Sequence, residues 1–142
     1  SDYPERMQGA MNIVVNGNYC VKCHTVEDFE PKGDATTFGP NLADVHRRLR
    51  PEFLRNWVAN PKRILPYTGM PVNIPYKPGE PGVAETLFHG TSVEQLDGLV
   101  DLLMNFDTYA RRQTEITPLV KESAAKNAPT TSDAANNKPS RR

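Results

Sequence analysis

Residues 20–24 read Cys20-Val21-Lys22-Cys23-His24, and this stretch decides how the rest of the chain is interpreted. Two cysteines separated by two residues lie about one helical turn apart, so both sulfurs can reach one edge of a flat porphyrin ring. The histidine that follows can present its imidazole to the iron from one face. The C-x-x-C-H spacing therefore predicts covalent attachment of one c-type haem through Cys20 and Cys23, with His24 as an iron ligand.

Two other uses of these residues would make the chain a haem-free interaction module. A redox dithiol is expected after a strand in a βαβ pattern, and the sequence shows no such pattern. A zinc site needs four ligands, and only the distant His46 could complete a set with Cys20, Cys23 and His24. The adjacency of Cys23 and His24 would strain that arrangement.

Around the motif the apolar residues recur at helical spacing. Their pattern predicts helices over residues 4–15, 42–49, 51–60 and 92–106. Ser92 and Gln95 have the spacing of a capping box at the start of the last of these helices. No convincing alternating strand pattern is present, and the long segments between the helices are rich in proline. The sequence thus predicts an all-α fold with long irregular loops, for which a large bound cofactor would be one reason.

Composition sets the remaining limits. The 142 residues include seventeen basic and seventeen acidic side chains, which speaks against a nucleic-acid-binding protein. Apolar runs are only a few residues long, so no membrane span is expected, and no secretory signal is seen at the Ser1 end. Residues 1–116 are expected to form one mildly acidic domain. Residues 117–142 are polar and are expected to be a low-complexity tail or linker.

Further motifs follow C-x-x-C-H in a specific order: Gly39-Pro40-Asn41-Leu42, then a helix with Trp57, then Thr68-Gly69-Met70-Pro71, then a closing helix. Over about residues 5–107 the chain therefore resembles the small class I monohaem cytochromes c. The resemblance implies a cytochrome c fold of four to five helices wrapped around one covalent haem c.

Carried over residue by residue, the resemblance also implies a set of haem contacts. It makes Met70 the second axial ligand opposite His24, and a thioether sulfur in that position favours ferrous iron. The Pro40 carbonyl would accept a hydrogen bond from His24 and fix its ring. Trp57 would donate to a haem propionate, or else pack in the core. Tyr67 would shield or hydrogen-bond near the haem, or else lie on the surface.

Within this family the glycine of the first helix often meets an aromatic residue of the last. Gly9 occupies the first place, but Leu102 stands where the aromatic is expected, so a different packing of the crossing is predicted.

The function implied by the resemblance is one-electron transfer by iron cycling between Fe(II) and Fe(III), without enzyme activity, either as a free carrier or as the electron-transfer domain of a larger redox protein. The alternative is a haem enzyme or gas sensor with an open iron site, for which His46 or His89 would serve as an acid–base group. Because haem attachment in this family is completed outside the cytoplasm, a periplasmic or equivalent location is implied. Redox partner proteins are implied too, and a basic cluster within Arg47–Arg63 suggests that one of them is acidic.

Overall fold

The computed structural model describes residues 3–109 and 115–127, and in these ranges it is helical, with no strand. Its α-helices are α1 (Tyr3–Val15), α2 (Val45–Arg48), α3 (Pro51–Ala59), α4 (Pro61–Ile64), α5 (Ser92–Met104), α6 (Phe106–Tyr109) and α7 (Ile116–Asn127). Short 3-10 helices lie at η1 (Cys20–Lys22), η2 (Ala35–Thr37) and η3 (Leu42–Asp44). The all-α prediction is confirmed. Four of the helices have nine or more residues, and three are single turns.

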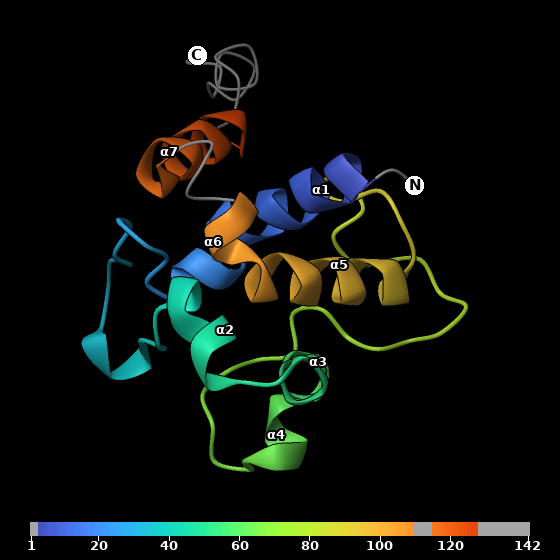
Figure 1. Cartoon of the computed structure of the whole chain (residues 1–142). Coiled ribbons are helices and arrows are strands. Elements are labelled where there is room, and N and C mark those ends of the chain that lie inside the picture. The colour runs from blue at the N-terminus through green and yellow to red at the C-terminus, as the bar shows by residue number, and fades with distance from the viewer. Residues whose placement is uncertain (1–2, 110–114, 128–142) are drawn as a thin grey trace, which may run out of the picture.

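The core lies mainly between α1 and α5, which make the most extensive contact of any pair of helices. They run side by side across the middle of Figure 1, with α7 on the far side of α1 and α2 to α4 beyond α5. Met7, Ile13, Leu99 and Phe106 are almost completely buried there. Each such side chain contributes roughly 1.5–3 kcal/mol when it is fully removed from water. None of the described helices is long and apolar enough to cross a bilayer.

Phe88, from the loop before α5, fills the place where α1 and α5 come together. A Cβ added at Gly9 of α1 would lie 2.8 Å from the ring of Phe88, and one added at Gly98 of α5 would lie 2.7 Å from it. Both positions therefore require glycine because the ring leaves no room for a side chain. The aromatic partner of Gly9 thus comes from a loop, whereas Leu102 is fully buried elsewhere in the core.

The start of α5 differs from the predicted capping box. Thr91 is the N-cap, and its side chain accepts a hydrogen bond from the backbone N–H of Glu94. The predicted pair is buried and serves the preceding loop instead. Ser92 donates to the Pro75 carbonyl at 2.5 Å and accepts from the Lys77 backbone N–H.

Gln95 is the second buried polar side chain that holds this loop. Its Nε2 donates to the Phe88 carbonyl at 2.8 Å, and its Oε1 accepts from the Ala84 backbone N–H at 3.3 Å. The amide fits closely under Gly82, where an added Cβ would overlap it. The proline-rich segment 72–91 is therefore held against α5 by hydrogen bonds from two buried side chains.

Part of the segment 117–142, which was expected to be a polar low-complexity tail or linker, is helical, because α7 extends from Ile116 to Asn127. Ile116 is fully buried, and α7 packs against α1. The carboxylate of Asp28 accepts hydrogen bonds from the backbone N–H groups of Ile116 and Thr117, at 2.8 and 3.1 Å. A loop residue thus caps a helix 88 positions later in the chain. Residues 128–142 of the predicted tail lie outside the described ranges.

Candidate functional site

The five residues of the C-x-x-C-H motif form one tight turn after α1. The backbone carbonyl of Cys20 accepts hydrogen bonds from the N–H groups of Cys23, at 3.2 Å, and His24, at 2.8 Å. Both cysteines are half-buried and neither forms a disulfide. The turn thus places His24 directly after the two cysteines, with its backbone hydrogen-bonded to that of Cys20.

The Gly39-Pro40-Asn41-Leu42 segment lies alongside this turn. Gly39 donates its N–H to the Cys23 carbonyl at 2.8 Å, and Leu42 donates to the Thr25 carbonyl at 2.9 Å. His24 and Gly39 form an isolated parallel bridge. The side-chain oxygen of Asn41 accepts from the backbone N–H groups of Glu27 and Ala43, which fixes the turn at Glu27 and caps η3.

This pairing orients the imidazole of His24. Its Nδ1 lies 2.7 Å from the Pro40 carbonyl oxygen, which is the contact implied by the family resemblance. A carbonyl oxygen can only accept, so Nδ1 carries the proton and Nε2 keeps its lone pair. Burial lowers the pKa of His24, although the Pro40 carbonyl acts in the opposite direction, and the ring is therefore neutral at pH 7.

Gly39 is required at its position by the ring of His24. A Cβ added at Gly39 would overlap three ring atoms of that histidine. Backbone and ring are therefore in direct contact, and the absence of a side chain at Gly39 is what allows Nδ1 to reach the Pro40 carbonyl. Glycine before proline in this segment is explained by the position of the imidazole.

Met70 lies in the loop after α4, and its sulfur has a specific partner. The indole Nε1 of Trp57, on α3, donates to Met70 Sδ at 3.0 Å. The backbone N–H of Met70 is held by the hydroxyl of Thr68 at 3.2 Å. Both Trp57 and Met70 are half-buried, so the two side chains form a defined pair at the side of the core.

Of the two sequence interpretations of Trp57, the structure shows packing against the core. In addition, the indole N–H donates to the sulfur of Met70, a contact that the sequence did not predict. Tyr67, for which the sequence left a haem contact or a surface position open, is 96% exposed. Nothing in the sequence pattern distinguished a tyrosine that follows Pro66 in a loop from one that folds back over the core.

The other two histidines are not part of the turn formed by residues 20–24. His46 pairs through Nε2 with the Asp107 carboxylate at 3.0 Å, which links α2 to α6. His89 is exposed. Among the described residues, no three histidine, cysteine or acidic side chains are grouped closely enough to hold a metal ion, so the zinc set with His46 is not assembled.

The protonation of Cys20 bears on the dithiol alternative. Burial raises the pKa of its thiol to about 12, against a smaller opposing effect of a backbone hydrogen bond. Reactive dithiols need the reverse, since the thiolate is the nucleophile and its formation requires a lowered pKa. The environment of Cys20 therefore does not favour thiol–disulfide exchange.

Some arginines of the basic cluster predicted within Arg47–Arg63 form ion pairs with acidic residues of the same chain. Arg55 forms a 2.7 Å ion pair with Asp97, and its guanidinium lies over the ring of Tyr76. Arg47 lies 3.8 Å from Asp44 and 3.7 Å from Asp107. These arginines connect elements of the fold, so only part of the cluster is available to another molecule.

Comparison with models of protein families, with curated proteins and with solved structures finds no match to this chain. Function therefore has to be argued from the residues themselves.

Proposed function

We propose that this chain is a monohaem c-type cytochrome that carries single electrons between redox proteins. The observation that carries the proposal is the state of His24. Its Nδ1–H is bound by the Pro40 carbonyl, its Nε2 is left with a lone pair, and it directly follows a turn that holds two unpaired cysteines. A neutral imidazole held by a backbone acceptor is the form in which histidine binds iron.

The residues present fit a covalent haem. Cys20 and Cys23 would each provide one thioether sulfur, and His24 would provide one iron ligand through Nε2. The thioether of Met70 would provide the other, because a sulfur that accepts one hydrogen bond from Trp57 still has a second lone pair. When bound, the haem would supply an iron that gains and loses one electron.

The chain's own part in this function is to hold its ligands still. The Pro40 carbonyl fixes the ring plane of His24 and makes the imidazole more basic. Gly39 lets the backbone approach that ring, and the Gly39 and Leu42 backbone bonds hold the whole segment against the motif. Trp57 and Thr68 fix the sulfur and the backbone of Met70. Rigid ligands change little between the two oxidation states, which favours electron transfer.

The proposal includes an extracytoplasmic location, because haem attachment to this motif is completed there in the family that the chain resembles. It also includes donor and acceptor proteins. Under the alternative of a haem enzyme or gas sensor, the sulfur of Met70 would stay with Trp57 and leave one side of the iron open to an added ligand.

The test is expression with a haem-attachment system, followed by denaturing gel electrophoresis and visible spectroscopy. We expect haem to remain on the denatured chain, and the Cys20→Ala/Cys23→Ala variant to lose it. The reduced protein should give a low-spin spectrum that carbon monoxide leaves unchanged, and Met70→Ala should bind the gas. A colourless protein would refute the proposal, whereas a wild-type spectrum that shifts with carbon monoxide would favour the enzyme or sensor.

A further inference from the structure

The helix α7 binds the chain just after the C-x-x-C-H motif. Its first two residues, Ile116 and Thr117, donate their backbone N–H groups to the carboxylate of Asp28 at 2.8 and 3.1 Å. Asp28 lies only four positions after His24 in the sequence. Ile116 is also fully buried, so α7 is held both by packing and by this cap. A helix 88 positions later in the chain therefore contacts the segment that carries the candidate iron ligand.

The other end of α7 faces the turn that precedes the motif. A surface pocket lies between the two segments, and it is lined by Gly17, Asn18, Ala124 and Asn127. The turn is ordered by the buried side chain of Asn16, whose oxygen accepts from the backbone N–H of Asn18 at 3.0 Å. The helix thus lies next to the chain both before and after the motif.

The segment between His24 and Asp28 is a tight turn with an unusual backbone conformation. Val26 and Phe29 exchange two backbone hydrogen bonds of 3.0 Å. Between them, Glu27 has a φ of 52°, in the left-handed region that residues other than glycine rarely adopt. A conformation of this kind persists only where the surrounding structure holds it. The shape of the turn therefore depends on its bonds to neighbouring segments.

The turn at residues 26–29 is held from both sides. On one side, the backbone N–H of Glu27 donates to the side-chain oxygen of Asn41 at 3.1 Å. On the other side, Asp28 binds α7. Asn41 directly follows Pro40, whose carbonyl oxygen lies 2.7 Å from Nδ1 of His24. Hydrogen bonds and short backbone segments thus connect α7, through Asp28 and Asn41, to the imidazole.

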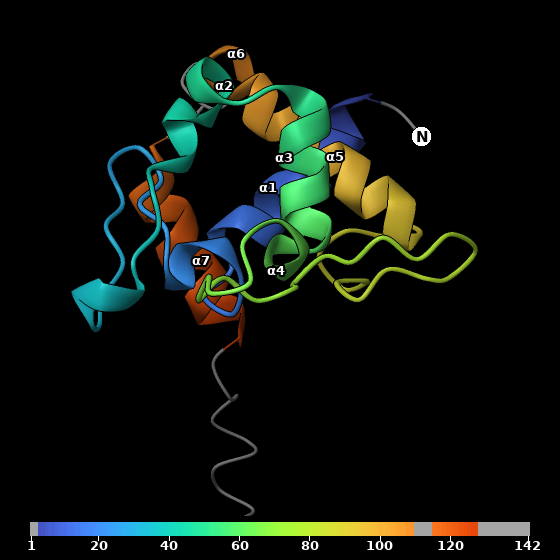
Figure 2. The same ribbon diagram turned by 90° about the horizontal axis from the view of Figure 1, so that it is seen from below.

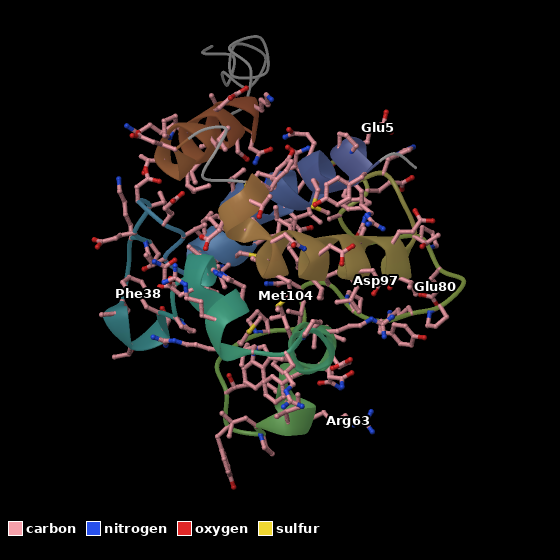
Figure 3. All side chains as sticks on the ribbon, viewed as in Figure 1. Glu5, Phe38, Arg63, Glu80, Asp97 and Met104 are labelled. Carbon is pink, nitrogen blue, oxygen red and sulfur yellow. The ribbon has the colours of Figure 1, made fainter. Side chains whose placement is uncertain are left out.

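These contacts lie away from Met70. Figure 2 shows the segment that follows the motif, in blue and cyan, on the same side of the molecule as α7. In Figure 3, Arg63 marks α4 at the end of the molecule opposite α7. Met70 lies in the loop after α4 and is bound by Trp57 of α3. The contacts of α7 are therefore separated by α1 and α5 from the side of the molecule on which Met70 lies.

We propose that Asp28, together with α7, positions the imidazole of His24 by fixing the turn at residues 26–29 and, through Asn41, the Pro40 carbonyl. Asp28 is a positioning residue, because it acts through its neighbours. The inference rests on the proposed function, in which the imidazole binds iron. A bond from Nδ1–H to a carbonyl makes the ring a more basic ligand, and a more basic ligand stabilises ferric iron. Release of α7 should therefore loosen the ring and raise the midpoint potential.

The experiment uses the full-length haem-loaded protein. Asp28→Ala removes the acceptor for α7, whereas Asp28→Asn keeps one side-chain oxygen that can accept. Ile116→Ala weakens the packing of α7 and leaves Asp28 in place. Thr91→Ala is the matched control, because Thr91 caps α5 by accepting the backbone N–H of Glu94 and has no part in the connection to His24.

Hydrogen exchange is followed by NMR in the reduced protein, and the midpoint potential of every variant is measured. The reporting groups are the backbone amides of Gly39 and Leu42, which bind the chain on either side of His24, and the Nδ1–H of its ring. The amides of Ala10 and Leu99, which lie in the core of α1 and α5, report unfolding of the whole protein and serve as the reference.

We expect Asp28→Ala and Ile116→Ala to speed exchange at the three reporting groups about threefold or more relative to the reference amides, and to raise the midpoint potential. Asp28→Asn should stay within about twofold of wild type, because its side chain still accepts from α7. Thr91→Ala should speed exchange only in the first turn of α5 and leave the potential unchanged.

The proposal is overturned if Asp28→Ala speeds exchange in α7 alone, since α7 would then be an independent appendage. Equal acceleration of the reporting and reference amides would also overturn it, because the effect would be a loss of overall stability. If no haem is attached, the proposed function fails, and exchange in the haem-free chain decides separately whether α7 is coupled to the His24 ring. A low-spin protein whose potential and exchange are the same in all variants would refute only the role of α7.

Discussion

The contact between Gly39 and His24 gives the sharpest prediction. The structure indicates how much stability Gly39→Ala should lose, and it offers another glycine, Gly17, as a control. Replacing Gly39 by alanine adds a methyl group that would overlap Cε1, Nδ1 and Nε2 of the His24 ring. Overpacking of this kind typically costs about 1–3 kcal/mol. Displacing the ring also breaks the 2.7 Å bond to the Pro40 carbonyl, worth about 0.5–1.5 kcal/mol. We therefore expect the free energy of unfolding to fall by about 1.5–4.5 kcal/mol.

Urea unfolding of the purified protein measures this loss, with Gly17→Ala as the matched control. A Cβ at Gly17 would have nothing within 4 Å, and its φ is not positive, so this alanine should be neutral or stabilise by a few tenths of a kcal/mol. In the haem-loaded protein Gly39→Ala should also alter the iron spectrum, whereas Gly17→Ala should not. If the two variants have equal stability within about 0.5 kcal/mol, the argument that glycine is required by the ring is wrong.

Three further predictions concern the contacts that hold the loops. Gln95→Ala should lower the free energy of unfolding by about 2–5 kcal/mol because two buried backbone groups lose their hydrogen-bond partner. The control Gln8→Ala, at an exposed position, should cost less than about 1 kcal/mol, and urea unfolding measures both values. Desolvation tends to raise the pKa of Asp28, but hydrogen bonds from the start of α7 outweigh it and hold that pKa below 3.8. The stabilisation is therefore present above pH 3.8 and is lost as pH falls below it. The protection of α7 amides relative to their intrinsic exchange rates should therefore fall there, and Asp28→Asn should remove that dependence. Trp57→Phe should cost about 1 kcal/mol in urea unfolding through loss of the bond to Met70, and no loss of stability would contradict a real hydrogen bond.

Helical periodicity predicted the main helices, because a helix with one buried face has apolar residues at regular spacing over its whole length. The predicted segments 4–15, 42–49, 51–60 and 92–106 correspond to α1, η3 with α2, α3, and α5 with the start of α6. The helix α7 was missed because its composition is polar and most of its residues are exposed. Its stability comes from Ile116, from contact with α1 and from the Asp28 cap, and none of these is encoded in the local pattern of residues 117–127.

The contact between His24 and the Pro40 carbonyl was implied by the family resemblance, which rests on the order of the motifs, and the structure has it. The roles of individual side chains were harder to predict from the sequence. Ser92 and Gln95 have the right spacing for a capping box, yet Thr91 and Glu94 have it as well, and burial decided between them. The indole N–H of Trp57 donates to Met70, which lies in the loop after α4. Sequence spacing does not determine the path of that loop, so it could not identify the acceptor.

The contacts of the long loops give another explanation for their length. From the sequence, an irregular segment such as 72–91 suggested a large cofactor that would order it. The structure orders it with two buried side chains of α5, and it orders the segment after His24 through Asn41. Loop length is therefore no argument for a haem. The proposal depends instead on the short turn of Cys20, Cys23 and His24, where Pro40 leaves Nε2 of the imidazole with its lone pair. A ring held in this tautomer by a backbone carbonyl is prepared for a metal, and the same variant series that moves the ring, led by Gly39→Ala, tests that preparation directly.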